Sequence, residues 1–216
     1  MGRVTAGADA APAAAPRTVH WVRQVHGGTV VVVPAVEHPG PEPTDASPVR
    51  GLLAGEGDAL VSSTGGTALA ILTADCASIA LGSPEGVIGA VHAGWRGLAA
   101  GVVERAVEAM EALGATEVVG ALGPCIHPGC YEFSQPDLDR VAAGLGDQVR
   151  GRTTWGRPAL DLPAATSAAL AAAGARERSG VDACTGCGGG YFSHRARGDV
   201  GRQALVVWSS AGGGAR

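Results

Sequence analysis

The sequence predicts a mixed α/β domain in which strands and helices alternate along the chain. Two observations support this fold class: short β-branched runs recur between turn residues, and several of them are separated by stretches with helical apolar spacing. The 216 residues are 46% hydrophobic, enough to bury a full core. We expect one domain over residues 18–209, a disordered Ala/Pro-rich lead over 1–17 and a flexible tail over 210–216.

Strands are predicted where apolar, often β-branched runs are bounded by Gly, Pro, Ser or Asp. These runs cover residues 29–33, 67–72, 78–81, 87–91, 117–122 and 204–208. The segment 38–57 is rich in Pro and contains acidic residues, which favours an exposed loop that serves as a lid or is only an insertion.

The clearest helix is predicted over residues 98–113. Its apolar residues fall on one helical face: Val102, Val103, Ala106, Val107, Met110 and Leu113. Gly114 follows as a C-terminal stop signal. Two further helices are predicted over 136–145 and 163–173, because each begins with a proline, which the first helical turn tolerates.

Composition excludes several classes of function. All basic residues are Arg, so enzymes that need a catalytic or phosphate-binding lysine are ruled out. The net charge of -4 argues against nucleic-acid binding, which normally requires a basic surface. The longest apolar run, near residues 68–81, is interrupted by Asp75 and is too short to span a membrane. With no secretory signal pattern, we expect a cytoplasmic protein that binds neither membrane nor nucleic acid.

Three residues form a candidate metal site, His26, Cys76 and His92. Each lies at or near a predicted strand end, where sites in sheet proteins are common. Two imidazoles and one thiolate are a plausible ligand set for catalytic zinc, with a fourth position left for water. Taken singly, each residue also suits an ordinary role, such as a small core cysteine or a hydrogen-bonded histidine.

Two charged residues accompany this site. Arg96 lies between Gly94 and Gly97 before the predicted helix, so this turn is a candidate for binding phosphate. Asp75 precedes Cys76 inside an apolar run, where an unpaired carboxylate is costly. It either orients a ligand imidazole or accepts local backbone hydrogen bonds. We therefore count Asp75 and Arg96 with Cys76 and His92 as candidate catalytic residues.

The remaining four cysteines offer a competing metal site. Cys125 and Cys130 are separated by four residues, and Cys184 and Cys187 by two. Both spacings suit a structural zinc, so a four-cysteine cluster stays open as an alternative. His127 in the same region is either a proton carrier or a solvent-facing histidine.

Five motifs occur in an order and at separations that resemble a known family. They are Gln24-Val25-His26-Gly27, the run from Gly57-Asp58-Ala59-Leu60 to Thr73-Ala74-Asp75-Cys76, His92-Ala93-Gly94-Trp95-Arg96-Gly97, Leu122-Gly123-Pro124 through Cys130-Tyr131-Glu132, and Tyr191-Phe192-Ser193-His194-Arg195 with Gly201-Arg202. The chain is similar to the laccase-domain proteins, which also carry the names polyphenol oxidase, purine nucleoside phosphorylase and peptidoglycan-editing factor. The resemblance covers about residues 20–208.

The resemblance implies a layered α-β sandwich with mixed sheets, distantly like toxin-type cysteine hydrolases. It implies that His26, Cys76 and His92 bind zinc, and that the enzyme cleaves adenosine, inosine and methylthioadenosine with phosphate. Adenosine deamination is the implied second activity. Zinc chemistry suits deamination, and an arginine-lined turn suits phosphate.

Alternative functions remain open. A multicopper oxidase needs many imidazoles, whereas this chain has six histidines and no His-x-His pair. A single copper bound by the same three residues is possible, because such a trio also forms blue-copper centres. In a different class, Cys76 activated by His92 is the nucleophile of an amide hydrolase that edits peptidoglycan precursors. A non-enzymatic metal-binding domain is a third possibility.

Overall fold

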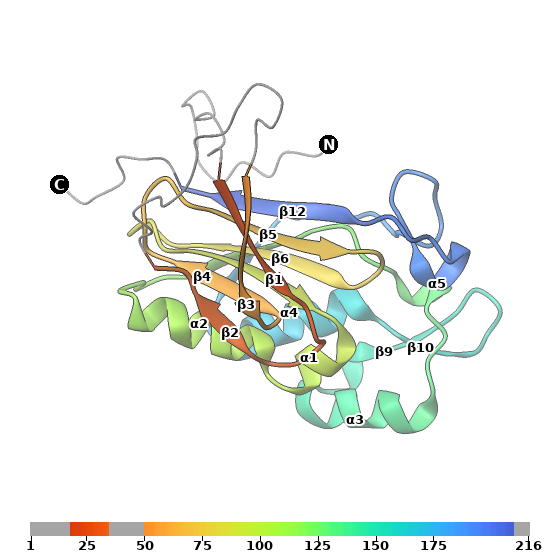
Figure 1. The fold of residues 1–216 in the computed structure, drawn as a ribbon. Coiled ribbons are helices and arrows are strands. Elements are labelled where there is room, and N and C mark those ends of the chain that lie inside the picture. Colours follow the sequence, from red (N-terminus) through yellow and green to blue (C-terminus); the bar gives the residue numbers. More distant parts are fainter. Residues whose placement is uncertain (1–17, 35–49, 210–216) are drawn as a thin grey trace.

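Two β-sheets pack face to face, and helices cover the outer face of the larger sheet (Figure 1). The structure is a computed structural model that describes residues 18–34 and 50–209. The predicted lead over 1–17, the predicted tail over 210–216 and part of the predicted loop, 38–49, lie outside the described residues.

The larger sheet has six strands in the order β11-β8-β6-β7-β4-β2. Their bounds are β2 Val30–Val32, β4 Ala59–Ser62, β6 Ala77–Gly82, β7 Ile88–Ala93, β8 Val119–Leu122 and β11 Arg176–Arg178. The central strands β8, β6, β7 and β4 are antiparallel to one another, whereas the edge strands β2 and β11 run parallel to their neighbours. The sheet is therefore mixed, as predicted.

The second sheet has four strands in the order β12-β5-β1-β3. Their bounds are β1 Thr18–Arg23, β3 Arg50–Glu56, β5 Ala68–Thr73 and β12 Gln203–Trp208. Strand β1 runs parallel to β3 and β5, and β12 is antiparallel to β5. A small antiparallel ribbon joins β9 (Arg150–Arg152) and β10 (Pro158–Leu160).

The core has two parts because both faces of the larger sheet are buried. On β4, Ala59 and Val61 belong to the cluster on the helical side, while Leu60 belongs to the cluster between the two sheets. Strand side chains alternate between faces, so one short strand contributes to both clusters. The predicted layered α/β sandwich is confirmed.

The helices follow capping signals in the sequence. Their bounds are α1 Trp95–Ala99, α2 Val102–Ala112, α3 Gln135–Leu145, α4 Leu162–Ala172 and α5 His194–Arg197, with short 3₁₀ turns η1 Pro128–Cys130 and η2 Asp147–Val149. The side chains of Ser134 and Asp161 accept backbone N–H groups at the starts of α3 and α4. Among the described residues, no helix is long and apolar enough to cross a membrane.

Several predictions of secondary structure were wrong. The single helix predicted over 98–113 is two helices, because Gly101 adopts a left-handed conformation with φ 73° at the start of α2. Part of the predicted loop, residues 50–56, is strand β3, whose sequence RGLLAGE carries two glycines and two charges and so has a weak strand pattern. Strands β1 and β4 were also missed, and pairing with neighbouring strands defines all three.

Candidate metal centre

The sheet register brings two of the candidate residues close together. Strand β6 begins at Ala77, just after Cys76, and Ser78 of β6 pairs with His92 of β7. On the other side of β7, Ala59 at the start of β4 pairs with Val91. Asp58 therefore precedes β4 next to His92. The same end of the larger sheet carries the thiol, one imidazole and a buried carboxylate.

Asp58 is the structural centre of this site. Its carboxylate is fully buried and accepts a hydrogen bond from Nδ1 of His92 at 2.7 Å. It also accepts the backbone N–H groups of His26 at 2.9 Å and Gly27 at 2.6 Å. Burial by itself raises the pKa of the Asp58 carboxyl, but the hydrogen bonds from His92, Gly27 and His26 outweigh it and hold that pKa below its ordinary value. Asp58 is therefore ionised at neutral pH.

The loop after β1 holds His26 in a conformation that this network enforces. His26 has φ 60°, in the left-handed region that few non-glycine residues adopt. The side-chain amide of Gln24 anchors the same loop to β5, donating to the carbonyl of Leu72 at 2.8 Å and accepting its N–H at 2.9 Å. The strained residue is thus held on both sides by hydrogen bonds.

Cys76 completes the cluster in the turn between β5 and β6. Its sulfur lies 3.9 Å from Nε2 of His26, and the ligand atoms of His26, Cys76 and His92 lie within 4.8 Å of one another. Burial raises the pKa of the Cys76 thiol, but hydrogen bonds with His26 and His92 reverse this and lower that pKa to about 6. For His92, burial lowers the pKa, whereas hydrogen bonds to Asp58 and Cys76 raise it to about 9. The two groups favour each other's charged forms.

The three donors fit a metal ion by their chemistry and by the space around them. When Nδ1 of neutral His92 donates to the ionised Asp58, the lone pair of the ring is on Nε2, where it could bind a cation as in carboxylate–histidine–zinc arrangements. A Cβ on Gly94 would lie 3.2 Å from both the Cys76 sulfur and Cδ2 of His26. Gly94 has φ -72°, so its lack of a side chain serves close approach to the donors.

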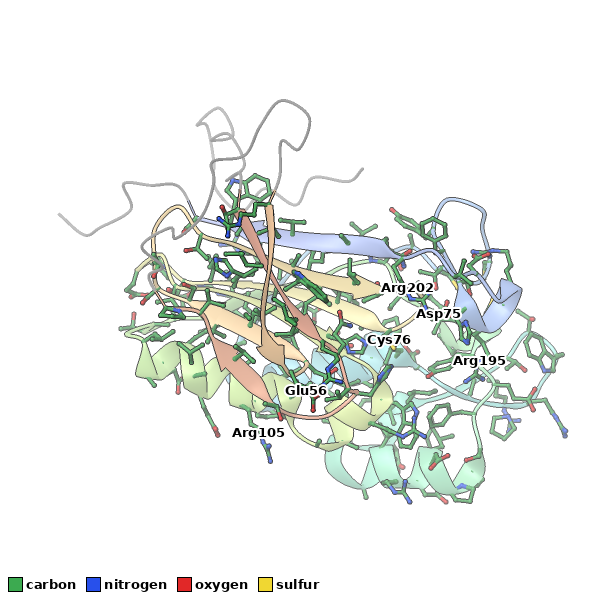
Figure 2. The ribbon with its side chains drawn as sticks, in the orientation of Figure 1. Glu56, Asp75, Cys76, Arg105, Arg195 and Arg202 are labelled. Atoms are coloured by element: carbon green, nitrogen blue, oxygen red, sulfur yellow. The ribbon has the colours of Figure 1, made fainter. Side chains whose placement is uncertain are left out.

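Asp75 lies beside the cluster but has partners that the sequence did not indicate. Its carboxylate accepts the hydroxyl of Thr185 at 2.6 Å and the backbone N–H of Arg195 at 2.7 Å. Figure 2 shows Asp75 and Cys76 at the same end of the central strands, with Arg195 on the side of α5. The carboxylate that orients the imidazole is Asp58, so Asp75 instead ties the Cys76 turn to a distant part of the chain.

Arg96 lies in a setting different from the predicted one. It belongs to the five-residue helix α1, and its guanidinium stacks 4.3 Å from the ring centre of Trp95. The side chain is exposed. The turn therefore offers an accessible cation, while the long helix that the sequence predicted behind it begins only at Val102.

Sequence reasoning missed Tyr131 and Arg195 as site residues. Burial and then the negative charge of Cys76 raise the pKa of the Tyr131 hydroxyl, with Arg195 and Arg96 acting in the opposite direction. The guanidinium of Arg195 lies 4.9 Å from the Tyr131 ring centre. Both residues, like Asp58, belong to the five motifs that carry the family resemblance, but only the tertiary structure shows that they meet near Cys76.

The other cysteines form a separate group. The sulfurs of Cys130, Cys184 and Cys187 lie within 4.8 Å of one another, whereas Cys125 is buried in the core and is not part of this group in the described part of the chain. His127 lies near Asp182, with 3.8 Å between Nε2 and Oδ1. The described part of the chain thus contains two separate clusters, where the sequence suggested a choice between them.

The fold and the first cluster define the class: an α/β sandwich with a candidate His₂Cys metal centre at one end of its sheets. The family model described as multi-copper polyphenol oxidoreductase laccase matches residues 5–210. The chain belongs to this laccase-domain family, which confirms the resemblance seen in the motifs.

Similar curated proteins carry an enzyme name. A protein named purine nucleoside phosphorylase from Streptomyces griseus is 41% identical over 196 residues, which cover 89% of this chain and 75% of that protein. Another of that name from Streptomyces coelicolor is 40% identical, with 89% of this chain and 76% of that protein covered. The curated relatives are thus named as nucleoside-cleaving enzymes.

Solved structures share the fold. A Neisseria meningitidis protein superposes with a TM-score of 0.72 at 28% identity, covering 89% of this chain and 75% of its own. YlmD from Geobacillus stearothermophilus gives a TM-score of 0.69 at 28% identity, with 88% and 74% covered. The layered arrangement of sheets and helices is therefore common to these proteins.

Proposed function

We propose that this chain is a zinc-dependent purine nucleoside phosphorylase that cleaves adenosine, inosine and methylthioadenosine with phosphate and also deaminates adenosine. The observation that carries the proposal is the convergence of His26, Cys76 and His92 within 4.8 Å, in a chain whose relatives are named purine nucleoside phosphorylases. Under this proposal purine nucleosides and phosphate are its substrates.

Zinc is the proposed ion because of the donor set. Two imidazoles and one thiolate leave one position open, which is the usual arrangement of catalytic zinc. Zinc bound in this way supplies Lewis-acid chemistry and an activated water for attack on a purine ring carbon. Copper is the competing ion, and its thiolate absorption in the visible range distinguishes it.

The chain's own residues prepare the site for these reactions. Asp58 holds the His92 ring by its Nδ1 and holds the His26 loop by three consecutive backbone N–H groups, so both imidazoles are oriented before substrate arrives. Because the Asp58 side chain is completely buried, little solvent competes for these bonds. The site is thus preorganised.

Two arginines give the site its affinity for an anion. Both Arg96 and Arg195 are exposed guanidinium groups whose charge acts on the Tyr131 hydroxyl, as does the charge of Cys76. Guanidinium groups bind phosphate with paired hydrogen bonds. We therefore propose that phosphate enters between these arginines, with Arg96 as its main contact. The Tyr131 hydroxyl keeps its proton at neutral pH and is a candidate donor to the substrate.

The test combines metal analysis with product analysis. The full chain is purified without chelator, its zinc and copper are measured by elemental analysis, and each nucleoside is incubated with and without phosphate. Free base and the sugar 1-phosphate that appear only with phosphate support phosphorolysis; the sugar product is ribose 1-phosphate from adenosine and inosine and 5-methylthioribose 1-phosphate from methylthioadenosine. Inosine with ammonia from adenosine and water supports deamination. Metal-bearing protein that turns over none of the three nucleosides contradicts the proposal.

A pair of arginine variants tests the anion site. Arg96→Ala is expected to raise KM for phosphate about tenfold, in line with the loss of one charged hydrogen-bonding group, and to leave KM for the nucleoside nearly unchanged. Arg178→Ala is the matched control, because Arg178 is an exposed arginine on the edge strand β11. If KM for phosphate is unchanged in Arg96→Ala, Arg96 is not the main contact of phosphate.

A second candidate function rests on the same residues. Cys76, His92 and Asp58 form a row of thiol, imidazole and buried carboxylate, which is the order found in cysteine hydrolases. As an amide hydrolase, the chain would act on peptidoglycan precursors without a metal. A chelator stops the zinc reaction and spares this one, whereas thiol alkylation of metal-free protein stops the hydrolase.

A further inference from the structure

The second cysteine cluster joins two segments that are distant in sequence. Cys130 ends the 3₁₀ turn η1, while Cys184 and Cys187 lie in the connection between β11 and α5. All three sulfurs lie within 4.8 Å of one another, and Cys130 and Cys187 are separated by 2.9 Å. Three thiols in one place are unusual unless they bond to each other or to a metal.

A backbone donor approaches one sulfur of the Cys184-Thr185-Gly186-Cys187 turn. The N–H of His127, which precedes the 3₁₀ turn η1, donates to the Cys184 sulfur at 3.3 Å. A hydrogen bond from a backbone N–H to sulfur favours the thiolate, which is the form that binds metals.

Gly186 is needed for the sulfurs to approach. A Cβ at this position would lie 2.8 Å from Cβ of Cys130 and 3.3 Å from its sulfur. Such contacts are too close for an ordinary side chain, so Gly186, the residue just before Cys187, is a glycine for a steric reason.

The segment around this turn has little apolar packing of its own. Residues 186–190 are almost all glycine, and among them Cys187, Gly188, Gly189 and Gly190 are exposed. Polar contacts attach the turn: Thr185 donates its hydroxyl to Asp75, and Arg197 donates to the carbonyls of Thr185 and Gly186. Where a segment has so little core, a metal crosslink is an effective source of order.

We propose that Cys130, Cys184 and Cys187 bind a second zinc ion, distinct from the one at His26, Cys76 and His92. Thiolate ligands select soft or borderline cations such as Zn²⁺. Three thiolates with a fourth, exchangeable ligand complete the usual tetrahedral coordination. Bound zinc ties η1 to the 184–187 turn, and through Thr185 it holds Asp75 next to Cys76. The second ion therefore has a structural role in support of the first site.

The experiment counts zinc in the full chain by native mass spectrometry. Protein is purified anaerobically with a phosphine reductant, loaded with Zn²⁺ alone and freed of excess ion. The wild type is expected to hold two zinc ions, Cys76→Ala one, Cys187→Ser one, and the double variant none. Cys125→Ala is the control, because Cys125 is a buried core residue outside the cluster, and it is expected to keep both ions.

Two readouts keep the outcome clear if a variant folds poorly. Cobalt bound to the Cys76→Ala protein is expected to give strong thiolate charge-transfer absorption, which the added Cys187→Ser change weakens. The proposal would be overturned if zinc-loaded wild type holds only one zinc ion and Cys76→Ala holds none. It would also be overturned by a Cys130–Cys187 disulfide that forms in air as fast in zinc-loaded protein as in zinc-free protein.

Discussion

Oδ1 of Asp58 accepts hydrogen bonds from both Nδ1 of His92 at 2.7 Å and the backbone N–H of His26 at 2.9 Å. One buried acid thus fixes two of the three donors in the candidate metal centre. Under the proposed metal binding, the affinity for the ion would depend on Asp58, a residue that would not contact the ion itself.

Asp58→Asn is expected to weaken zinc binding at the His₂Cys site about 10- to 100-fold, because a neutral amide orients His92 less firmly. Asp58→Ala is expected also to lower the free energy of unfolding by about 3 kcal/mol, since it leaves buried donors unpaired. Competition with a chromogenic chelator measures the first effect and urea denaturation the second. Asp147→Asn, at an exposed acid, is the control for both. Equal zinc affinity in Asp58→Asn and wild type would refute the role of Asp58.

Gly94→Ala is expected to weaken zinc binding about tenfold, because its new Cβ lies 3.2 Å from the Cys76 sulfur and displaces a donor. The backbone of Gly94, with φ -72°, accepts alanine without strain, so the effect reports on packing alone. Gly82→Ala is the matched control on β6, because within the described part of the chain its Cβ would have no neighbour inside 4 Å. Chelator competition measures the zinc affinity of both variants and of the wild type. Only Gly94→Ala is expected to differ from the wild type.

Cys76→Ala is expected to remove one equivalent of zinc and all phosphorolysis while the domain remains folded. The thiol supplies a metal ligand, whereas its loss from a partly exposed turn leaves the core clusters intact. Elemental analysis, nucleoside turnover and circular dichroism of the same sample test the three parts. Phosphorolysis at the wild-type rate in this variant would exclude the His₂Cys site as the reaction centre.

Two glycines near the end of α3 have different backbone conformations: Gly144 is helical, whereas Gly146 has a positive φ. Gly144→Ala is expected to raise the free energy of unfolding by about 0.5–1 kcal/mol, because alanine favours helix and, as far as the structure describes, its Cβ meets open space. Gly146→Ala is expected to lower it by about 1 kcal/mol, since Gly146 has φ 88° and its Cβ would meet the Gln148 side chain. Thermal unfolding of both variants decides. If both variants change the unfolding temperature in the same direction, the different backbone conformations of Gly144 and Gly146 are contradicted.

Local sequence signals succeeded where the residues alone determine the structure. The apolar runs near Ile71, Ile79 and Val91 are strands, and the prolines at 136 and 163 do stand in first helical turns. The signals failed where long-range pairing decides. Strand β3 exists because it pairs with β1, although its own residues indicate a loop. Likewise, Gly101 broke a helix whose apolar spacing continues across it.

The candidate site shows the same division. Residue type and position singled out His26, Cys76 and His92, because few side chains bind metals and these three flank strand ends. For Asp75, the acid adjacent to Cys76, the sequence left two roles open, orienting a ligand imidazole or accepting local backbone hydrogen bonds. The structure instead brings Asp58 to His92 through the register of β4 and β7, and joins Asp75 to Thr185 and Arg195.

The sequence by itself determined the α/β class, the family motifs and the three donors of the first cluster, because residue chemistry and periodicity are local properties. Only the tertiary structure decided which acid orients the imidazole, and that Cys130 joins Cys184 and Cys187 while Cys125 enters the core. The physical reason is that hydrogen bonds and metal ligation act over a few ångströms in space. Among the residues that the structure describes, hydrogen-bonded partners lie up to 145 positions apart, and the Asp75–Arg195 pair beside the candidate site spans 120.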